Sequence, residues 1–302
     1  MIKQVSLNLR RINIFLTVAK HLSYTKAARE LYISQPAITK NIQMLEDELG
    51  VCLFNRKGNT IELTHEGKLV YSFGSDIDQQ VQNLMYELGQ INSKQKGNLR
   101  IGASSTISHY FIPPVIARFK ESNPGLSISL LSGNTSEINA RLNDDLIDVG
   151  ITEGYRRLNN FDYYSFLNDE IAFISHKNNP VHFPETFSKE KLAELPLVLR
   201  ETGSGTREVF EKAIKGVGLT LNDLNITITL GSTESIKSYL IDSEALGVFS
   251  TSAIRKNEEN LFKISRLEKT LVTRRFQFMV KQGSAHKLGK EFIRFSKKYY
   301  NL

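Results

Sequence analysis

The stretch "LYISQPAITKNIQMLEDELG", residues 31–50, decides how the first part of the chain folds. It predicts one short helix, because Ser34 is a good N-cap, Pro36 is tolerated in a first turn and Gly50 favours a helix end. At about 100° per residue, one face of this helix is apolar and consists of Ile38, Ile42, Leu45 and Leu49. We therefore expect that face to pack against the rest of its domain.

The opposite face of the same helix carries short polar groups, namely Gln35, Pro36, Thr39, Lys40 and Gln43. Glutamine pairs with adenine, threonine bonds to bases or touches a thymine methyl group, and lysine reaches guanine or phosphate. The face therefore suits a DNA groove. A merely solvated helix face is the alternative, and the surrounding sequence decides between the two.

Two more helices and a hairpin are predicted around this stretch. A first helix is indicated by the spacing of Leu9, Ile12, Phe15, Leu16 and Ala19, and Ser23 caps a second helix over residues 25–32. The segment "VCLFNRKGNTIELT", residues 51–64, predicts two strands around a Gly58–Asn59 turn. Two helices joined by a tight turn, with a hairpin behind them, form a winged helix-turn-helix.

A long helix follows in "THEGKLVYSFGSDIDQQVQNLMYELGQINSKQKGN", residues 64–98. Apolar residues recur there at steps that average about 3.5 residues, which is the spacing of a coiled-coil seam. They are Val70, Phe73, Ile77, Val81, Leu84, Leu88 and Ile91. Packing against its own domain is the alternative, but a helix between two domains has little chain to cover it. We expect a homodimer through this helix.

From residue 98 onward, strand and helix patterns alternate. Strands are predicted in "LRIGAS", "LSISLLSG", "DVGITE", "LPLVLRE", "ITITLGS", "LGVFST" and "RRFQFMVKQG". Helices are predicted in "FIPPVIARFKESNPG", in "TSEINARLNDDLI" and at 206–215, 233–243 and 286–300. This alternation indicates a parallel-rich α/β sheet that binds ligands at the carboxyl ends of its strands. The length suits two small α/β lobes.

Residues 15–68, "FLTVAKHLSYTKAARELYISQPAITKNIQMLEDELGVCLFNRKGNTIELTHEGK", resemble the DNA-binding domain of LysR-type transcriptional regulators. The shared elements are the Ala27–Ala28 pair, "SQPAIT", "LEDELG", "LFNR" and "LTHEG". The likeness extends more loosely to the end of the chain. "RETGSGTR" and "GITEG" are similar to the branch that contains regulators of carbon fixation and of cysteine and sulfite metabolism.

The resemblance implies an N-terminal winged helix-turn-helix, a dimerising linker helix and a two-lobed α/β effector domain like a periplasmic binding protein. The expected boundaries are 1–66 for the DNA-binding domain, 67–97 for the linker and 98–302 for the effector domain. Lobe I is expected over about 98–168 and 270–302, and lobe II over about 169–269. The resemblance also implies tetramers, although the sequence leaves dimer and tetramer open.

DNA contact is expected from the polar face of residues 31–50 and from the wing. The expected residues are Ser34, Gln35, Pro36, Thr39, Lys40, Gln43 and Arg56, of which Arg56 is placed to enter the minor groove. The family often has serine and arginine where this chain has Thr39 and Lys40. Lysine lacks the planar fork that reads guanine best, so the preferred operator is expected to differ in detail.

Hydroxyl-rich turns lie where predicted strands end, and most of them lead into helices. Helix N-termini and short hydroxyl groups both favour anions. The expected effector-binding residues are Ser104, Ser105, Thr106, Thr152, Glu153, Thr202, Ser204, Thr206 and Thr233, with Arg207 adjusting the charge. The effector is expected to be a small anion or carboxylate. Plain helix capping is an equally good interpretation of any single residue in this set.

Composition excludes several other classes. The net charge of +7 permits an anionic partner. No apolar run reaches transmembrane length and no signal sequence is visible, so a cytoplasmic location without membrane attachment is expected. The single cysteine, Cys52, is expected to be a buried hydrophobe, and the effector region has none for a disulfide switch. The six histidines lack zinc-ligand spacing, so no metal or cofactor is expected.

An enzyme is the main rival class, and the sequence speaks against it. "GSGTRE" lacks the lysine of a phosphate-binding loop and the third glycine of a dinucleotide fingerprint. Hydrolase and metalloprotease motifs are absent, and Ser108 beside His109 does not make a catalytic pair. A binding protein without regulatory function is the second rival, which the DNA-binding pattern disfavours. Effector, operator, and activation or repression stay open.

Overall fold

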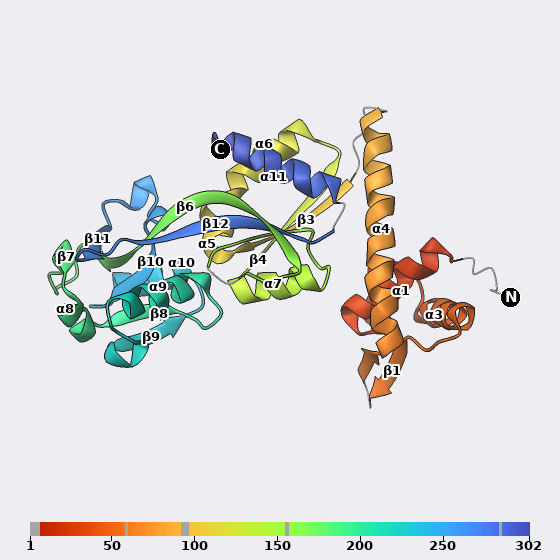
Figure 1. Ribbon diagram of the computed structural model, residues 1–302, viewed down its shortest axis with the longest axis horizontal. Helices are drawn as coiled ribbons and strands as arrows, with labels where there is room; N and C mark the ends of the chain where they lie inside the picture. The colour runs from red at the N-terminus through yellow and green to blue at the C-terminus, as the bar shows by residue number, and fades with distance from the viewer. Residues whose placement is uncertain (1–6, 58–59, 92–96, 155–156, 284–285) are drawn as a thin grey trace. The chain divides into compact units, whose positions relative to one another are not determined.

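The computed structural model describes residues 7–57, 60–91, 97–154, 157–283 and 286–302. They form two compact units (Figure 1). The first unit contains all elements up to the long helix, and the second contains all later strands and helices. The limits expected for the DNA-binding domain, the linker and the two lobes stay predictions.

The first unit consists of four helices and a hairpin. They are α1 (Leu9–His21), α2 (Tyr24–Glu30), α3 (Gln35–Leu49), β1 (Phe54–Lys57), β2 (Thr60–Leu63) and α4 (His65–Ile91). The predicted caps are confirmed, because the Ser23 and Ser34 side chains accept from the N–H groups of Lys26 and Ala37 at 3.3 and 3.4 Å. Gly50 ends α3 at φ 70°. The predicted Gly58–Asn59 turn lies outside the described residues.

The core of this unit holds α3 in place. Ile38, Ile42 and Leu45 are buried as predicted, and Leu49 is partly buried. The Phe15 ring of α1 lies 5.4 Å from the Phe54 ring of β1, which fixes the hairpin to the helices. Burial of each large apolar side chain contributes about 1.5–3 kcal/mol, so the apolar face of α3 fixes which face is left outside.

The prediction for Cys52 was wrong, because its side chain is exposed. The neighbouring Leu53 takes the buried position instead. The Cys52 carbonyl accepts a bond of 2.7 Å from the Thr64 hydroxyl, which holds the backbone in place. In an extended segment the next side chain then points the other way.

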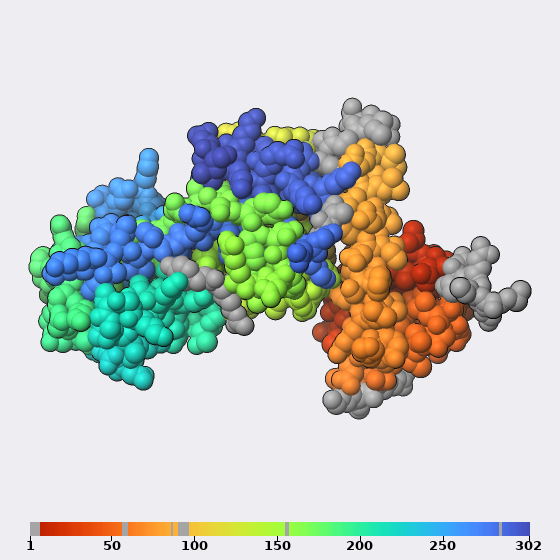
Figure 2. All heavy atoms as spheres, in the orientation of Figure 1, coloured from red at the N-terminus to blue at the C-terminus, as the bar shows by residue number. Residues whose placement is uncertain are grey.

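Helix α4 packs closely on α1 around Gly74. A Cβ added at Gly74 would lie 3.2 and 3.3 Å from side-chain atoms of Ile12 and Leu16, so α1 and α4 approach closely there. The later turns extend beyond the three helices and the hairpin (Figures 1 and 2). Leu84, Met85 and Leu88 are exposed there to 57%, 52% and 44%. The predicted seam therefore leaves an apolar face uncovered within its own unit.

The second unit is a large α/β structure. Its first elements are β3 (Gly97–Ser104), α5 (Ser105–Tyr110), α6 (Ile112–Ser122), β4 (Leu126–Gly133), α7 (Thr135–Asn143), β5 (Val149–Thr152) and β6 (Phe161–His176). The middle elements are β7 (Thr186–Phe187), α8 (Lys189–Glu194), β8 (Leu197–Arg200), α9 (Gly205–Gly216), η1 (Leu221–Asp223), β9 (Ile226–Leu230) and α10 (Thr233–Ile241). The last are β10 (Leu246–Ser250), η2 (Thr251–Ala253), η3 (Lys256–Glu258), β11 (Phe262–Leu267), β12 (Val272–Lys281) and α11 (Lys287–Tyr299).

Two long strands join the lobes of this unit. The sheet order is β4-β3-β5-β12-β6-β10-β8-β9. Strands β3, β4 and β5 pair in parallel in lobe I, and β8, β9 and β10 pair in parallel in lobe II. Between them, β6 and β12 pair antiparallel along most of their length (Figure 1). The parallel strands of lobe I and those of lobe II therefore lie on either side of a two-stranded connection.

The structure contains elements that sequence reasoning missed, namely α5, β6, β7, α8 and β11. Strand β6 includes the polar run Asn168–Asp169–Glu170, which is more typical of a turn. It stays extended because those residues cross between the lobes, where β12 supplies partners for Asn168, Asp169 and Glu170.

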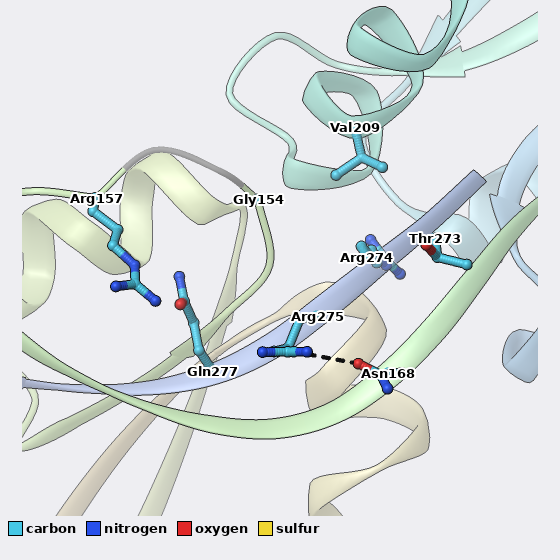
Figure 3. A pocket seen from close by; sticks show the side chains of 8 residues that line it. All are labelled: Gly154, Arg157, Asn168, Val209, Thr273, Arg274, Arg275 and Gln277. Atoms are coloured by element: carbon cyan, nitrogen blue, oxygen red, sulfur yellow. Dashed lines mark hydrogen bonds between the residues drawn. The ribbon is translucent and has the colours of Figure 1, made fainter. Parts of the chain in front are cut away.

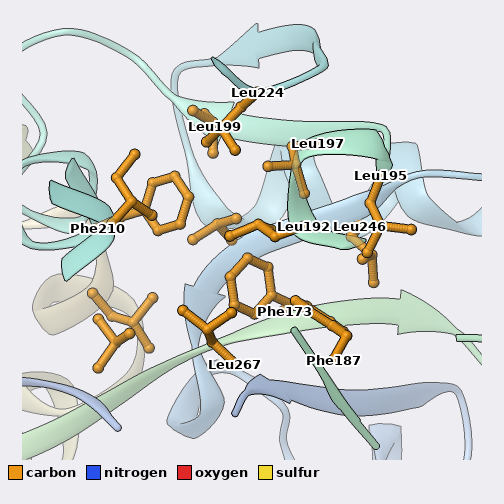
Figure 4. Packing of buried hydrophobic residues seen from close by; sticks show 14 of the residues in the cluster. Phe173, Phe187, Leu192, Leu195, Leu197, Leu199, Phe210, Leu224, Leu246 and Leu267 are labelled. Atoms are coloured by element: carbon orange, nitrogen blue, oxygen red, sulfur yellow. The ribbon is translucent and has the colours of Figure 1, made fainter. Parts of the chain in front are cut away.

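The core of lobe II packs helices on its strands (Figure 4). The Phe173 ring of β6 lies 5.9 Å from the Phe210 ring of α9 and 4.9 Å from the Phe187 ring of β7. Aromatic pairs in such edge-to-face contact stabilise a core beyond their buried area. This packing fixes α9, and so the hydroxyl groups at its first turn.

Candidate functional sites: a DNA-reading face and a hydroxyl-lined lobe junction

The polar face of α3 is open to solvent. Ser34, Gln35, Pro36, Lys40 and Gln43 are exposed, and Thr39 is half-buried. Gln35 Nε2 donates to Thr39 Oγ1 at 3.2 Å, and Thr39 Oγ1 donates to the Gln35 carbonyl at 3.2 Å. The two side chains thus order each other before any partner arrives. Lysine, glutamine and threonine on one rigid face offer hydrogen-bonding groups of the kinds that base edges in the major groove accept.

Arg56 lies in β1, opposite Ile61 in the hairpin register. Its side chain falls outside the described residues, so the expected minor-groove role stays a prediction. The backbone nevertheless places Arg56 in the hairpin that forms the wing.

Three of the expected effector residues meet at the junction of the lobes around one arginine that sequence reasoning missed. Arg274 of β12 donates through Nη1 to Glu153 Oε1 at 3.0 Å and to Thr206 Oγ1 at 2.7 Å, and through Nε to Asp169 Oδ2 at 2.7 Å. Ser104 Oγ donates to the other Glu153 oxygen. Ser104 of β3, Glu153 just after β5 and Thr206 of α9 are therefore brought together in one network.

Two carboxylates share this single cation, and each of their oxygens has a donor. Ser250 Oγ donates to Asp169 Oδ1 at 2.6 Å and completes the set. The side chains of Arg274, Glu153 and Asp169 are 1%, 2% and 0% exposed. A signal for Arg274 was present in "RRFQF", because strand alternation places it on the side of buried Phe276. The alternation in this strand does not predict that the partners of Arg274 are Glu153 and Asp169.

Four of the predicted hydroxyl groups are buried and accept or donate no hydrogen bond among the described residues. They are Ser105 Oγ, Thr106 Oγ1, Ser204 Oγ and Thr233 Oγ1. Arg274 Nη2 is in the same state. Unsatisfied buried polar groups cost about 1–3 kcal/mol each and are rare in native proteins. Such a group of them is the mark of a site that receives hydrogen bonds from a bound molecule or water.

Helix capping does not account for these hydroxyl groups. Ser204 is the N-cap of α9, yet its side chain makes no cap hydrogen bond. Helix α10 is capped by Ser232, whose hydroxyl accepts from the Ser235 N–H at 3.0 Å. The Thr233 hydroxyl is therefore not the capping group of this helix. The N-terminal turns of α9 and α10 therefore combine open hydroxyl groups with free backbone N–H groups.

The remaining predicted residues are placed differently. The Thr152 hydroxyl donates to Met279 Sδ at 3.0 Å inside the lobe I core. Thr202 is exposed. Together with Ser204 and Arg207 it lines a cavity of about 720 Å³ between α7 and α9. Arg207 forms an ion pair with Glu211 at 2.7 Å, so its charge is already compensated.

The two lobes are in close contact at this junction. A Cβ on Gly205 would lie 2.6 and 2.7 Å from Glu153 Cγ and O, so only glycine fits. The Ser136 N–H donates to the Gly203 carbonyl at 3.2 Å and joins α7 to the loop before α9. The arrangement can enclose a small molecule.

A second contact crosses between the lobes at α5 and α10. Tyr110 Oη donates to Glu234 Oε1 at 2.5 Å, and Lys237 Nζ lies 5.5 Å from the Tyr110 ring. Burial, together with the Glu234 and Glu258 carboxylates, raises the pKa of the Tyr110 hydroxyl well above its ordinary value. The hydroxyl therefore stays protonated and keeps donating. This contact brings the helix of Ser105 and Thr106 next to the helix of Thr233.

The described residues contain no helix long and apolar enough to cross a membrane. Within the same residues, histidine, cysteine, aspartate and glutamate form no group suited to hold a metal ion.

A winged helix-turn-helix with an open polar face, followed by two lobes around unsatisfied hydroxyl groups, defines a DNA-binding regulator that senses a small molecule. Comparison with known proteins agrees. Residues 9–68 match the family of bacterial regulatory helix-turn-helix proteins of the lysR family, and residues 92–300 match the LysR substrate binding domain. The chain belongs to the LysR family of transcriptional regulators and is not an enzyme.

Two relatives place the chain within the family. It is 30% identical to the HTH-type transcriptional regulator CysL of Bacillus subtilis (strain 168), over 82% of this chain and 81% of that protein. It is 32% identical to the RuBisCO operon transcriptional regulator of Allochromatium vinosum, over 71% and 70%. The fold resembles a full-length variant of OxyR from Pseudomonas aeruginosa, with 18% identity, a TM-score of 0.71 and coverage of 97% and 95%.

Proposed function

We propose that this regulator senses a small anion or small carboxylate at the lobe junction. The observation that carries the proposal is the set of four buried, unpartnered hydroxyl groups beside the unsatisfied Arg274 Nη2. Hydroxyl and N–H donors bind anions well in a site that excludes water, and α9 and α10 point N-terminal turns at it. We further propose that Thr202 and Ser204 line the entrance, because they line the neighbouring cavity.

A carboxylate that also carries an amino group is the second candidate. Glu153 and Asp169 bear two negative charges against the single positive charge of Arg274. An ammonium group offsets that excess, whereas a simple anion adds to it. The two candidates differ in one experiment, because only the second predicts that amino acids outperform their deaminated analogues.

Thermal-shift measurements on the whole chain test the site. The panel contains inorganic sulfate, inorganic phosphate, acetate, small dicarboxylates and matching amino acids. We expect a rise in melting temperature for one member, because a ligand that binds only the folded state stabilises it. Thr106→Val and Ser204→Ala remove two of the open hydroxyl groups, and they are expected to abolish the rise that is caused by a ligand held by these hydroxyl groups. A flat response of the native chain across the panel would argue for another effector class.

On the DNA side, we propose that Ser34, Gln35, Pro36, Thr39, Lys40, Gln43 and Arg56 contact the operator. The exposed polar face of α3 supports the α3 residues. Alanine variants of Gln35, Thr39, Lys40 and Arg56 are to be compared in gel shifts on the DNA upstream of the gene at one fixed salt concentration. Unchanged affinity and sequence preference in all four would refute the assignment.

We also propose that the chain acts in the cytoplasm as a homodimer, and that such dimers form tetramers. The exposed Leu84, Met85 and Leu88 of α4 support the dimer, because an apolar helix face of this kind is normally covered by a second helix. Sedimentation of Leu84→Glu tests it, with dissociation to monomers expected. The boundary between DNA-binding domain and linker, near residue 66, is part of the same proposal.

A further inference from the structure

A separate cavity of about 510 Å³ lies beside the crossing strands, and it is basic. Its lining is Gly154, Arg157, Asn168, Val209, Thr273, Arg274, Arg275 and Gln277 (Figure 3). Three of these residues are arginines, and this described lining contains no aspartate or glutamate. None of the hydroxyl residues assigned to the effector belongs to it.

Arg157 and Arg275, two exposed arginines of this cavity, have no acidic partner among the residues that the structure describes. Within the described residues, neither Arg157 nor Arg275 forms an ion pair. The Arg157 guanidinium lies 5.3 Å from the Tyr163 ring, and Arg275 Nε donates to Asn168 Oδ1 at 3.4 Å. Both contacts orient the guanidinium groups without neutralising them. Figure 3 shows the Gln277 side chain between Arg157 and Arg275.

Nearby carboxylates do not cancel this charge. Glu170 is paired with Arg266 through two hydrogen bonds of 2.6 and 3.1 Å. The Glu208 carboxylate lies close to Gly154, but Glu208 is among the residues that line the other cavity, between α7 and α9, and not among those that line this one. Glu153 and Asp169 are held by Arg274 and have a donor on every oxygen. The cavity therefore holds two uncompensated guanidinium groups.

We propose that this cavity is a second binding site, distinct from the hydroxyl-lined one, for a small dianion of the phosphate, sulfate or dicarboxylate kind. Guanidinium groups bind the oxygens of such anions through paired, charge-assisted hydrogen bonds. The Gln277 amide adds a neutral donor between them, and the half-enclosed space admits a ligand of a few heavy atoms.

An occupant of this cavity touches both lobes. Gly154 follows β5 of lobe I, Val209 belongs to α9 of lobe II, and Arg275 and Gln277 lie on the connecting strand β12. Arg274 lines the same cavity and holds Glu153 and Thr206 of the hydroxyl-lined site. The dianion is therefore expected to alter the affinity of the first site, because one side chain belongs to both.

Calorimetric titration of the whole chain with inorganic phosphate, sulfate and malonate tests the proposal. We expect at least one of these to bind, and the Arg157→Ala/Arg275→Ala variant to weaken that binding about ten-fold or more. Arg294→Ala is the matched control, because Arg294 is an exposed arginine on α11 away from this cavity. It is expected to titrate like the native chain. Far-UV circular dichroism checks that all variants are folded.

The result also separates this site from the proposed effector site. Thr106→Val with Ser204→Ala is expected to leave binding at the arginine cavity within about two-fold, since neither residue lines it. The proposal is overturned if no dianion binds the native chain, if the double arginine variant binds like the native chain, or if Arg294→Ala weakens binding equally. If the dianion fails to bind only when Thr106→Val and Ser204→Ala are combined, the hydroxyl-lined site is the one that binds it, and the proposal of a second site is overturned.

Discussion

Replacing Arg274 by methionine tests whether the lobe junction is held by charge. The change keeps a flexible, unbranched side chain, although one shorter than arginine, and removes the cation that pairs with Glu153 and Asp169, whose side chains are 2% and 0% exposed. Breaking one buried ion pair by removing a partner costs about 3–5 kcal/mol, because the remaining charge stays buried and unpaired. Here one substitution leaves two such charges, so we expect a loss at the upper end of that range.

The assay is urea unfolding of the whole chain at pH 7, followed by far-UV circular dichroism, with the slope compared between variants. Arg266→Met is the matched control. Arg266 forms a comparable pair with Glu170, but their side chains are 46% and 24% exposed, so the expected loss is below about 1 kcal/mol.

A rescue variant separates charge from packing. Adding Glu153→Gln and Asp169→Asn to Arg274→Met removes both unpaired charges and keeps the shapes. We expect it to regain at least half of the lost stability. The reasoning is refuted if Arg274→Met costs no more than Arg266→Met, or if the triple variant is less stable than the single one.

Three other changes have defined outcomes. Lys40→Ala is expected to weaken operator binding and lower the salt slope by about 1, which binding at several salt concentrations measures; an unchanged slope contradicts a phosphate contact. Gly205→Ala places a Cβ 2.6 Å from Glu153 Cγ, so a loss of about 1–3 kcal/mol is expected in urea unfolding, and a neutral result would mean the lobes separate easily. Burial raises the pKa of Glu258, but hydrogen bonds from Lys237 and Arg255 outweigh it and hold the pKa below 4.5. Its stabilising effect is then present above the ordinary glutamate pKa and is lost as the pH falls through the lower pKa of the folded protein. Glu258→Gln is therefore expected to be destabilising at pH 7 and progressively less so as the pH falls below the ordinary glutamate range; an effect that does not change with pH would refute this.

The winged helix-turn-helix was predictable because its signals are local. The caps Ser23 and Ser34, the stop at Gly50 and the spacing of Ile38, Ile42 and Leu45 each act within a few residues. The structure confirms all of them. Cys52 was misjudged because the residue type says only how often such a side chain is buried, and here the neighbouring Leu53 takes the buried position.

The lobe junction was only partly predictable because its contacts are distant in sequence. The hydroxyl groups could be found, since each lies at a strand end. Arg274 could not be joined to Glu153, which lies 121 residues earlier, or to Asp169, which lies 105 residues earlier. The arginine cavity was missed for the same reason, since Arg157 and Arg275 meet only after β12 returns to lobe I.

The return of β12 to lobe I also sets an order of assembly during synthesis. Lobe I needs β12 between β5 and β6, and it needs α11, whose Phe292 ring packs 5.3 Å from Phe119. These elements emerge from the ribosome after the other strands and helices of lobe I, whereas the DNA-binding unit is complete much earlier and domains generally fold as they emerge. A chain truncated before β12 therefore retains the operator-reading helix without a finished sensor. Nonsense mutations late in the gene are expected to yield proteins that occupy DNA without responding to the effector.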